Sequence, residues 1–129
     1  MTFYEMIRER FQAHLTPTPF DDLYMEMPPL DTAEPYAVLS TGDEPHVTYS
    51  FGAEFHREEF TIRVVDKTQE AADAYARQVL DVFEDKEPEL AVDGMNVSLL
   101  RKDKISNQFV ESGFWITEIV FSTEYETVR

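Results

Sequence analysis

The stretch Glu59–Phe83, EFTIRVVDKTQEAADAYARQVLDVF, decides the fold because the hydrophobic period changes within it. Every second residue from Phe60 to Val64 is apolar, which predicts a strand with one buried face. Thr68 is a favourable N-cap residue, and a helical apolar period follows it, which predicts a helix over residues 69–84. The predicted buried face of this helix consists of Ala72, Tyr75, Ala76, Val79 and Phe83.

A second helix is predicted at the N-terminal end, over residues 3–15. Its apolar stripe recurs every four positions and consists of Phe3, Ile7, Phe11 and Leu15. Thr2 and Glu5 fit a capping box at its start, and prolines follow its end. The connection from Pro17 to Pro35 is predicted to be mostly irregular, and a short strand is expected over residues 36–40.

Residues 47–51 and 54–65 are predicted to form a projecting β-hairpin, with Gly52-Ala53 as a two-residue type II′ turn. This register places His56 opposite Tyr49 and His46 opposite Glu59. The outer part of the hairpin carries aromatic side chains of the kind enriched in interfaces. We therefore predict that three of them contact a subunit or partner: Tyr49, Phe51 and Phe55.

The C-terminal part is predicted to contain a strand over residues 96–101, a polar loop over residues 102–113 and a long strand over residues 114–125. The last strand is apolar on both faces, although a sheet with helices on one side should be polar on the other. We expect the open face to be covered by the Pro17–Pro35 connection or by another subunit. The interface residues predicted on this face are Phe114, Ile116, Glu118 and Val120.

Composition limits the classes of function. The 129 residues are expected to form one domain, 1–129, and the net charge is −15. This acidity opposes binding to nucleic acid or to an anionic membrane. The chain has no cysteine, which excludes disulfides and thiolate chemistry. No apolar stretch is long enough to span a membrane and no signal-peptide pattern occurs at the start, so an intracellular-type protein is expected.

No catalytic pattern emerges, so we predict that the chain is not an enzyme and uses no metal or cofactor. The histidines His14, His46 and His56 lack metal-ligand spacing and are predicted to be solvated at the surface. No nucleophile elbow or phosphate-cradling glycine loop is present. The 26 acidic residues are expected to be solvated or to contact other subunits. A cleft enzyme that uses carboxylates is the least favoured alternative.

Three basic residues, Arg101, Lys102 and Lys104, lie close together before the last strand. They are expected either to keep a hairpin loop soluble or to meet an acidic surface on a neighbouring protein. Glu118 has two interpretations. It is either a charge that guards an edge strand against aggregation or one half of an ion pair between subunits.

The order of these elements resembles that of the tail-terminator or tail-completion proteins of long-tailed bacteriophages, which join head and tail at the neck. The resemblance covers residues 3–125 and includes the junction between the strand ending at Val65 and the helix beginning Thr68-Gln69-Glu70-Ala71. It implies an α+β fold, a mainly antiparallel β-sheet with two α-helices packed on one face. It also implies a structural virion protein without enzymatic activity.

The partners that the resemblance implies are further copies of the chain in a ring, usually a hexamer, together with the tail-tube protein and the head-side connector or neck proteins. DNA is expected to pass through the ring without specific binding, and no membrane is involved. The expected location is the virion neck, after assembly in the host cytoplasm. Alternative functions are an acidic, non-enzymatic protein-binding adaptor, or another neck or tail-tube component of similar fold.

Overall fold

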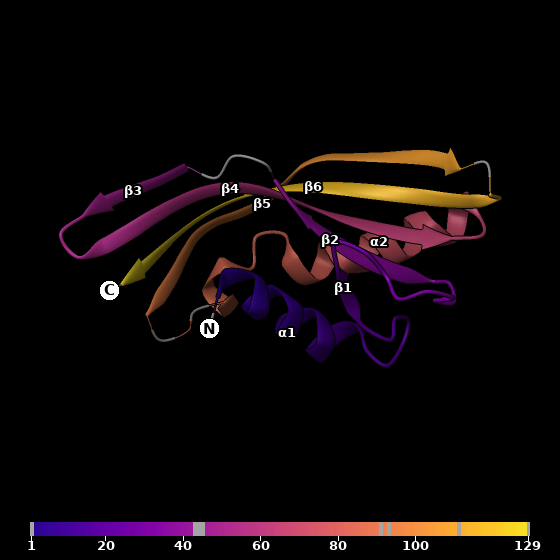
Figure 1. Ribbon diagram of the computed structural model, residues 1–129, viewed down its shortest axis with the longest axis horizontal. Helices are drawn as coiled ribbons and strands as arrows, with labels where there is room; N and C mark the ends of the chain where they lie inside the picture. The colour runs from indigo at the N-terminus through magenta and orange to yellow at the C-terminus, as the bar shows by residue number, and fades with distance from the viewer. Residues whose placement is uncertain (1, 43–45, 91, 93, 111, 129) are drawn as a thin grey trace.

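The chain forms a six-stranded β-sheet with two α-helices on one face, in a computed structural model that describes residues 2–42, 46–90, 92, 94–110 and 112–128 (Figure 1). The predicted α+β class is therefore confirmed. The elements in chain order are α1 (Phe3–Leu15), β1 (Leu23–Met25), β2 (Tyr36–Thr41), β3 (His46–Ser50), β4 (Ala53–Asp66), α2 (Gln69–Phe83), the 3-10 turn η1 (Glu87–Leu90), β5 (Met95–Val110) and β6 (Phe114–Val128).

The sheet is built around the long antiparallel pair β4 and β6, in the order β1-β2-β4-β6-β5. β2 pairs with the second half of β4 and β3 pairs with its first half, so both lie along the same edge of β4. β1 pairs with β2 in parallel, and the other described pairs are antiparallel. The β3–β4 hairpin extends beyond the start of α1, as Figure 1 shows.

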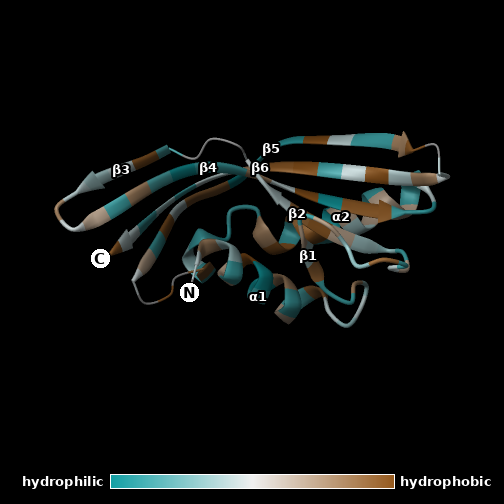
Figure 2. Cartoon of the chain, in the orientation of Figure 1, coloured by the Kyte–Doolittle hydropathy of each residue, from teal (hydrophilic) through white to brown (hydrophobic). Residues whose placement is uncertain are grey.

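Stacked and edge-on aromatic rings join the helices to the sheet. Phe3 of α1 stacks on Tyr125 of β6, with ring centroids 4.4 Å apart. Phe121 of β6 stacks on Phe60 of β4 at 5.0 Å and meets Phe83 of α2 edge-on at 6.2 Å. All five rings are buried within one hydrophobic cluster. This cluster holds both helices on the same face of the sheet, and Figure 2 shows the apolar residues that alternate along the strands.

Both predicted helix starts are confirmed. The Thr2 hydroxyl accepts a hydrogen bond from the Glu5 amide, while the Glu5 carboxylate accepts one from the Thr2 amide. The Thr68 hydroxyl accepts a hydrogen bond from the Ala71 amide at the start of α2. These bonds satisfy amide groups that have no partner within the helix itself, so short sequence signals were sufficient to locate both starts.

The predicted hairpin turn is wrong by one residue. The turn residues are Phe51 and Gly52, with φ of 46° and 80°, and Ser50 pairs with Ala53. Two positive φ values are typical of type I′, which follows the twist of the strands better than other tight turns. The register consequently places Tyr49 opposite Glu54, and not opposite His56 as predicted.

The other histidine pairing predicted for this hairpin is also wrong. His46 lies opposite Arg57, and not opposite Glu59. The prediction that the two histidines are not cross-strand partners is confirmed, because His56 lies opposite Val47.

The predicted loop over residues 102–113 is also wrong, because β5 continues to Val110 and pairs with β6 along its length. Most side chains in this half of β5 are exposed, which explains their loop-like composition. Pairing with the β-favouring residues of β6 overrides the weak local preference. Shifts in register mark irregularities in β5 between Val97 and Leu99 and between Lys102 and Lys104.

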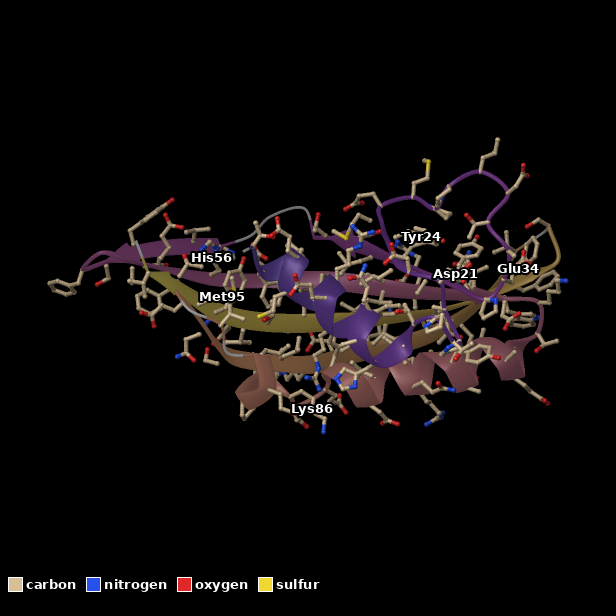
Figure 3. The ribbon with its side chains drawn as sticks, turned by 90° about the horizontal axis from the view of Figure 1, so that it is seen from below. Asp21, Tyr24, Glu34, His56, Lys86 and Met95 are labelled. Atoms are coloured by element: carbon tan, nitrogen blue, oxygen red, sulfur yellow. The ribbon has the colours of Figure 1, made fainter. Side chains whose placement is uncertain are left out.

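The Pro17–Pro35 connection packs on the helix side of the sheet. Phe20 and Leu23 are fully buried in the core, and Phe20 contacts Phe11 and Tyr75. The segment also contributes the short strand β1, which was not predicted, but its other residues are irregular as expected. This connection was expected to cover the face of the sheet that lies away from the helices, but its core contacts are on the helix side. Of the two covers proposed for that face, only another subunit therefore remains. Figure 3 shows Asp21, Tyr24 and Glu34 of this connection from below.

We predict that Phe121→Ala lowers the free energy of unfolding by about 3–5 kcal/mol, because it leaves a cavity between β4, β6 and α2. Chemical denaturation followed by circular dichroism measures this loss. Phe51→Ala is the matched control, since the Phe51 side chain is fully exposed, and a change within about 0.5 kcal/mol is expected. Equal losses in the two variants would contradict the assigned core.

Candidate interaction surfaces

The face of the sheet that lies away from the helices is called the open face here. On β6 it carries the even-numbered residues from Phe114 to Glu126, while odd-numbered residues from Thr117 to Tyr125 are buried beneath the helices. The predicted division of β6 into two faces is therefore confirmed. Ile116 and Val120 are half-buried on the open face, beside Val65 and Thr61 of β4.

Glu118 also lies on the open face. Its interpretation as an edge-strand guard is wrong, whereas its role in an ion pair between subunits stays a prediction. β6 is an interior strand between β4 and β5, so Glu118 does not guard an edge. Its carboxylate accepts a hydrogen bond from Arg63 Nε at 2.9 Å within the same chain. Arg63 also donates to the Ser40 hydroxyl at 2.9 Å. Arg63 thus connects side chains of β2, β4 and β6 on the open face.

Charge is distributed unevenly between the two sides of the sheet. Among the strand residues that the structure describes, register and hydrogen bonding place four basic and five acidic side chains on the open face: Arg57, Arg63, Arg101, Lys104, Glu59, Asp103, Glu118, Glu124 and Glu126. Ion pairs join Arg57 to Glu124, Arg63 to Glu118 and Arg101 to Asp103. This face is almost neutral although the chain carries −15, so most of the negative charge lies elsewhere.

The predicted basic cluster does not form one patch. Arg101 and Lys104 lie on the open face, whereas Lys102 pairs with Phe121 and shares the helix side with it. Arg101 lies 3.6 Å from an Asp103 carboxylate oxygen. Lys102 and Lys104 lie in β5 rather than in the predicted loop, and strand alternation separates the side chains of Arg101 and Lys102.

The hairpin tip carries the three predicted aromatic residues, and all three are exposed. Phe51 is completely exposed at 107%, Tyr49 is 61% exposed and Phe55 is 44% exposed. The register places Phe55 on the open face and Tyr49 on the helix side. The three rings therefore surround the end of the hairpin and do not form a single flat patch.

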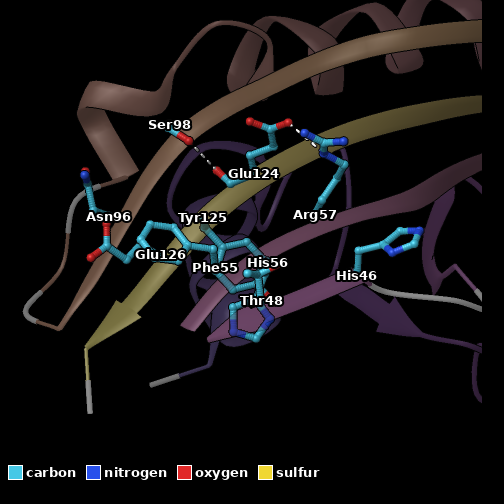
Figure 4. Close-up of a pocket in the computed structure, with 10 residues that line it drawn as sticks. All are labelled: His46, Thr48, Phe55, His56, Arg57, Asn96, Ser98, Glu124, Tyr125 and Glu126. Atoms are coloured by element: carbon cyan, nitrogen blue, oxygen red, sulfur yellow. Dashed lines mark hydrogen bonds and ion pairs between the residues drawn. The ribbon is translucent and has the colours of Figure 1, made fainter. Parts of the chain in front are cut away.

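A groove of about 400 Å³ lies at the base of this hairpin (Figure 4). Most of its walls belong to the open face, and Phe55 contributes an aromatic surface. Ser98 donates a hydrogen bond to the Glu124 carbonyl, and Arg57 donates one to the Glu124 carboxylate at 2.9 Å. The residues that line the groove are His46, Thr48, Phe55, His56, Arg57, Asn96, Ser98, Glu124, Tyr125 and Glu126.

The prediction that all three histidines are solvated is wrong for His56. Its ring stacks on Tyr125 with centroids 4.5 Å apart, and its Nε2 lies 3.4 Å from a Glu54 carboxylate oxygen. Among the described residues, His56 Nδ1 is buried without a hydrogen-bond partner. His14 and His46 are exposed as predicted. His56 thus extends the aromatic stack of the core toward the hairpin.

The acidic segment after α2 has a structural role that was not predicted from the sequence. The Glu84 carboxylate accepts a hydrogen bond from the Lys102 amide, and the Glu87 carboxylate accepts one from the Leu100 amide. The Asp85 amide donates to the Leu100 carbonyl. These groups satisfy part of the backbone of β5, and such cover protects a strand edge from unwanted pairing. A run of acidic residues gives no sequence signal of this contact.

Within the described ranges, no group of three or more histidine, aspartate or glutamate side chains is arranged to hold a metal ion. None of the described helices is long and apolar enough to cross a membrane.

Comparison with known proteins shows a shared fold. A chain in a solved structure described as "Virion of native gene transfer agent (GTA) particle" is similar to this chain, with a TM-score of 0.64 and 19% sequence identity. The match covers 90% of this chain and 84% of the other. No family model matches the sequence. No curated protein matches it either.

Two tyrosines beside the hairpin base, Tyr4 and Tyr125, are expected to ionise at a higher pH than an ordinary tyrosine. Burial raises the pKa of Tyr4 and Tyr125, and the nearby Glu58 carboxylate raises both further. The folded state therefore favours the neutral form of both tyrosines. Their contribution to the free energy of unfolding is complete below the unfolded pKa near 10 and is lost as pH rises through the higher folded pKa values. We predict that the folded protein at pH 11 has fewer ionised tyrosines, measured by absorbance at 295 nm, than the unfolded chain. Full ionisation of all 6 in the folded state would contradict this assignment.

We predict that the combined replacement of Tyr49, Phe51 and Phe55 by Ser leaves the subunit folded, because all three rings are exposed. Circular dichroism should show an unchanged spectrum, and the free energy of unfolding should fall by less than about 2 kcal/mol. Assembly with other copies or partners should be blocked. A fall of tens of degrees in Tm would show instead that these rings belong to the core.

Proposed function

We propose that this chain is a structural virion protein of a phage or phage-like particle, and specifically a ring-forming tail terminator. The observation that carries the proposal is the fold shared with a chain from a gene transfer agent virion over 90% of the present chain, at a TM-score of 0.64. The finer assignment to the neck rests on the resemblance in element order to tail terminators.

The surfaces of the molecule support a role in assembly. An aromatic hairpin tip projects where the subunit's own core cannot bury it, and exposed aromatic side chains are enriched in interfaces. The open face combines half-buried Ile116 and Val120 with neutralised charge. These features suit contacts with further copies, with the tail-tube protein below and with connector or neck proteins above.

The proposed mechanism is the capping of a polymer. Head-to-tail contacts between copies close into a ring when the rotation between them closes. One face of the ring matches the end of the tail tube and stops the addition of tube subunits, while the other face receives the head-side connector. DNA passes through the ring without specific binding, because the −15 charge of each copy opposes phosphate binding.

This role requires no catalysis, cofactor or membrane, and it places the protein in the virion neck after assembly in the host cytoplasm. A second candidate is another neck or tail-tube component with the same fold. The similarity to a virion chain supports either candidate equally. Electron microscopy of growing tail tubes distinguishes them, because a terminator shortens the tubes in proportion to its concentration, whereas a tube component lengthens them.

We predict that self-association strengthens as salt rises from about 10 mM to about 150 mM. Repulsion between copies of charge −15 acts over about 30 Å at the lower salt concentration and about 8 Å at the higher. Sedimentation velocity should show the 15.0 kDa subunit converting to a discrete closed oligomer.

Two other sedimentation results would contradict parts of this proposal. Weaker association at higher salt would show that repulsion does not control assembly. A strict monomer at high concentration across the whole salt range would favour the adaptor function over the ring.

A further inference from the structure

The position of Phe51 is unusual for a tight turn. Its backbone has φ of 46° in a type I′ turn, where asparagine or glycine is normally favoured over a bulky residue. Its side chain is fully exposed, so the subunit gains no burial from it. Neither backbone preference nor the core therefore explains an aromatic residue at this position, which points to a contact outside the subunit.

The groove at the hairpin base has the chemistry to receive such a residue. Phe55 offers an exposed aromatic wall, and Ser98, Asn96 and Arg57 provide polar groups around it. A volume of about 400 Å³ is within the range of pockets that bury most of a small ligand, so a phenyl ring and part of its turn can enter.

Phe51 cannot reach the groove of its own subunit. Phe55 lies four positions further along an extended strand, which corresponds to roughly 13 Å at about 3.3 Å per residue. The paired strands of the hairpin hold the tip away from its base. A ring that enters this groove must therefore come from another molecule.

Charge favours a second copy of the chain as the source. Two molecules of charge −15 repel each other wherever unneutralised carboxylates meet. Around the groove, Arg57 is paired with Glu124, and the open face as a whole is almost neutral. The uncharged Phe51–Gly52 tip adds no charge to this face, so this contact avoids the repulsion that opposes other approaches.

We propose that Phe51 of one copy inserts into the groove of a second copy, beside Phe55. This contact rests on the self-association proposed above and assigns residues to it. Because the tip and the groove are different surfaces, repetition of the contact in one direction generates a ring or a filament, whereas reciprocal exchange generates a closed dimer.

Disulfide trapping tests this contact without background, because the chain has no cysteine. The variant Phe51→Cys/Ser98→Cys should form covalent multimers under mild oxidation at 150 mM salt, seen as a ladder on non-reducing gels. Phe109→Cys/Ser98→Cys is the matched control, because Phe109 is another exposed aromatic residue, 56% accessible, near the opposite end of the sheet. The single variants Phe51→Cys and Ser98→Cys identify symmetric dimers.

A ladder no stronger than that of the control pair would overturn the contact. If wild-type protein still formed rings in that case, the ring proposal would survive with other residues, and a partner of different sequence would be the occupant of the groove. A double variant that forms only dimers, each closed by two disulfides, would support the contact and refute the ring.

Sedimentation provides a second measurement that does not depend on disulfide geometry. Phe51→Ser removes the inserted ring, and Ser98→Trp fills the groove. Each should weaken self-association about ten- to a hundredfold. Phe109→Ser should leave it unchanged. Unchanged association in both Phe51→Ser and Ser98→Trp would also overturn the contact.

Discussion

The aromatic stack across β4 and β6 is the interaction on which the rest of the structure depends. Phe121 contacts Phe60 in the neighbouring strand and Phe83 in α2, while Tyr125 contacts Phe3 in α1. Aromatic pairs of this geometry add to the stabilisation from buried area. One row of rings thus positions both helices on the same face of the sheet. The other face of the sheet consequently has no helix against it.

The same arrangement explains why the hairpin has no cover from the helices. β4 and β6 run side by side along the whole of β4, but α1 begins with Phe3, which lies against Tyr125 rather than farther toward the tip. His56 continues the stack by one ring, and beyond it the side chains of β3 are all exposed. The hairpin therefore projects because the strands extend farther than the helices that cover them.

Sequence reasoning succeeded where one local signal determined the result. The capping box at Thr2 and the alternation from Phe60 to Val64 depend on neighbouring residues alone, and both are confirmed. Prediction failed where contacts between residues distant in the sequence determine the structure. The outer half of β5 looks like a loop until pairing with β6 is known, and Glu118 looks unpaired until Arg63 lies opposite it. The hairpin pattern in the sequence was enough to predict that the aromatic rings at the tip are exposed. The groove beside them could not be predicted, because its walls come from four strands whose register the sequence does not reveal.

Electrostatics then restricts how such a molecule can associate. Long-range repulsion between strongly acidic copies is reduced only where their facing surfaces are neutral or where salt screens the charge. The cross-strand pairs Arg57–Glu124 and Arg63–Glu118 are partly exposed, so each contributes little to the stability of the subunit. Their larger effect is to neutralise the open face without removing its carboxylates. The negative charge on the rest of the molecule can in this way keep copies of the chain apart in solution, while the nearly neutral open face still allows close contact with another molecule.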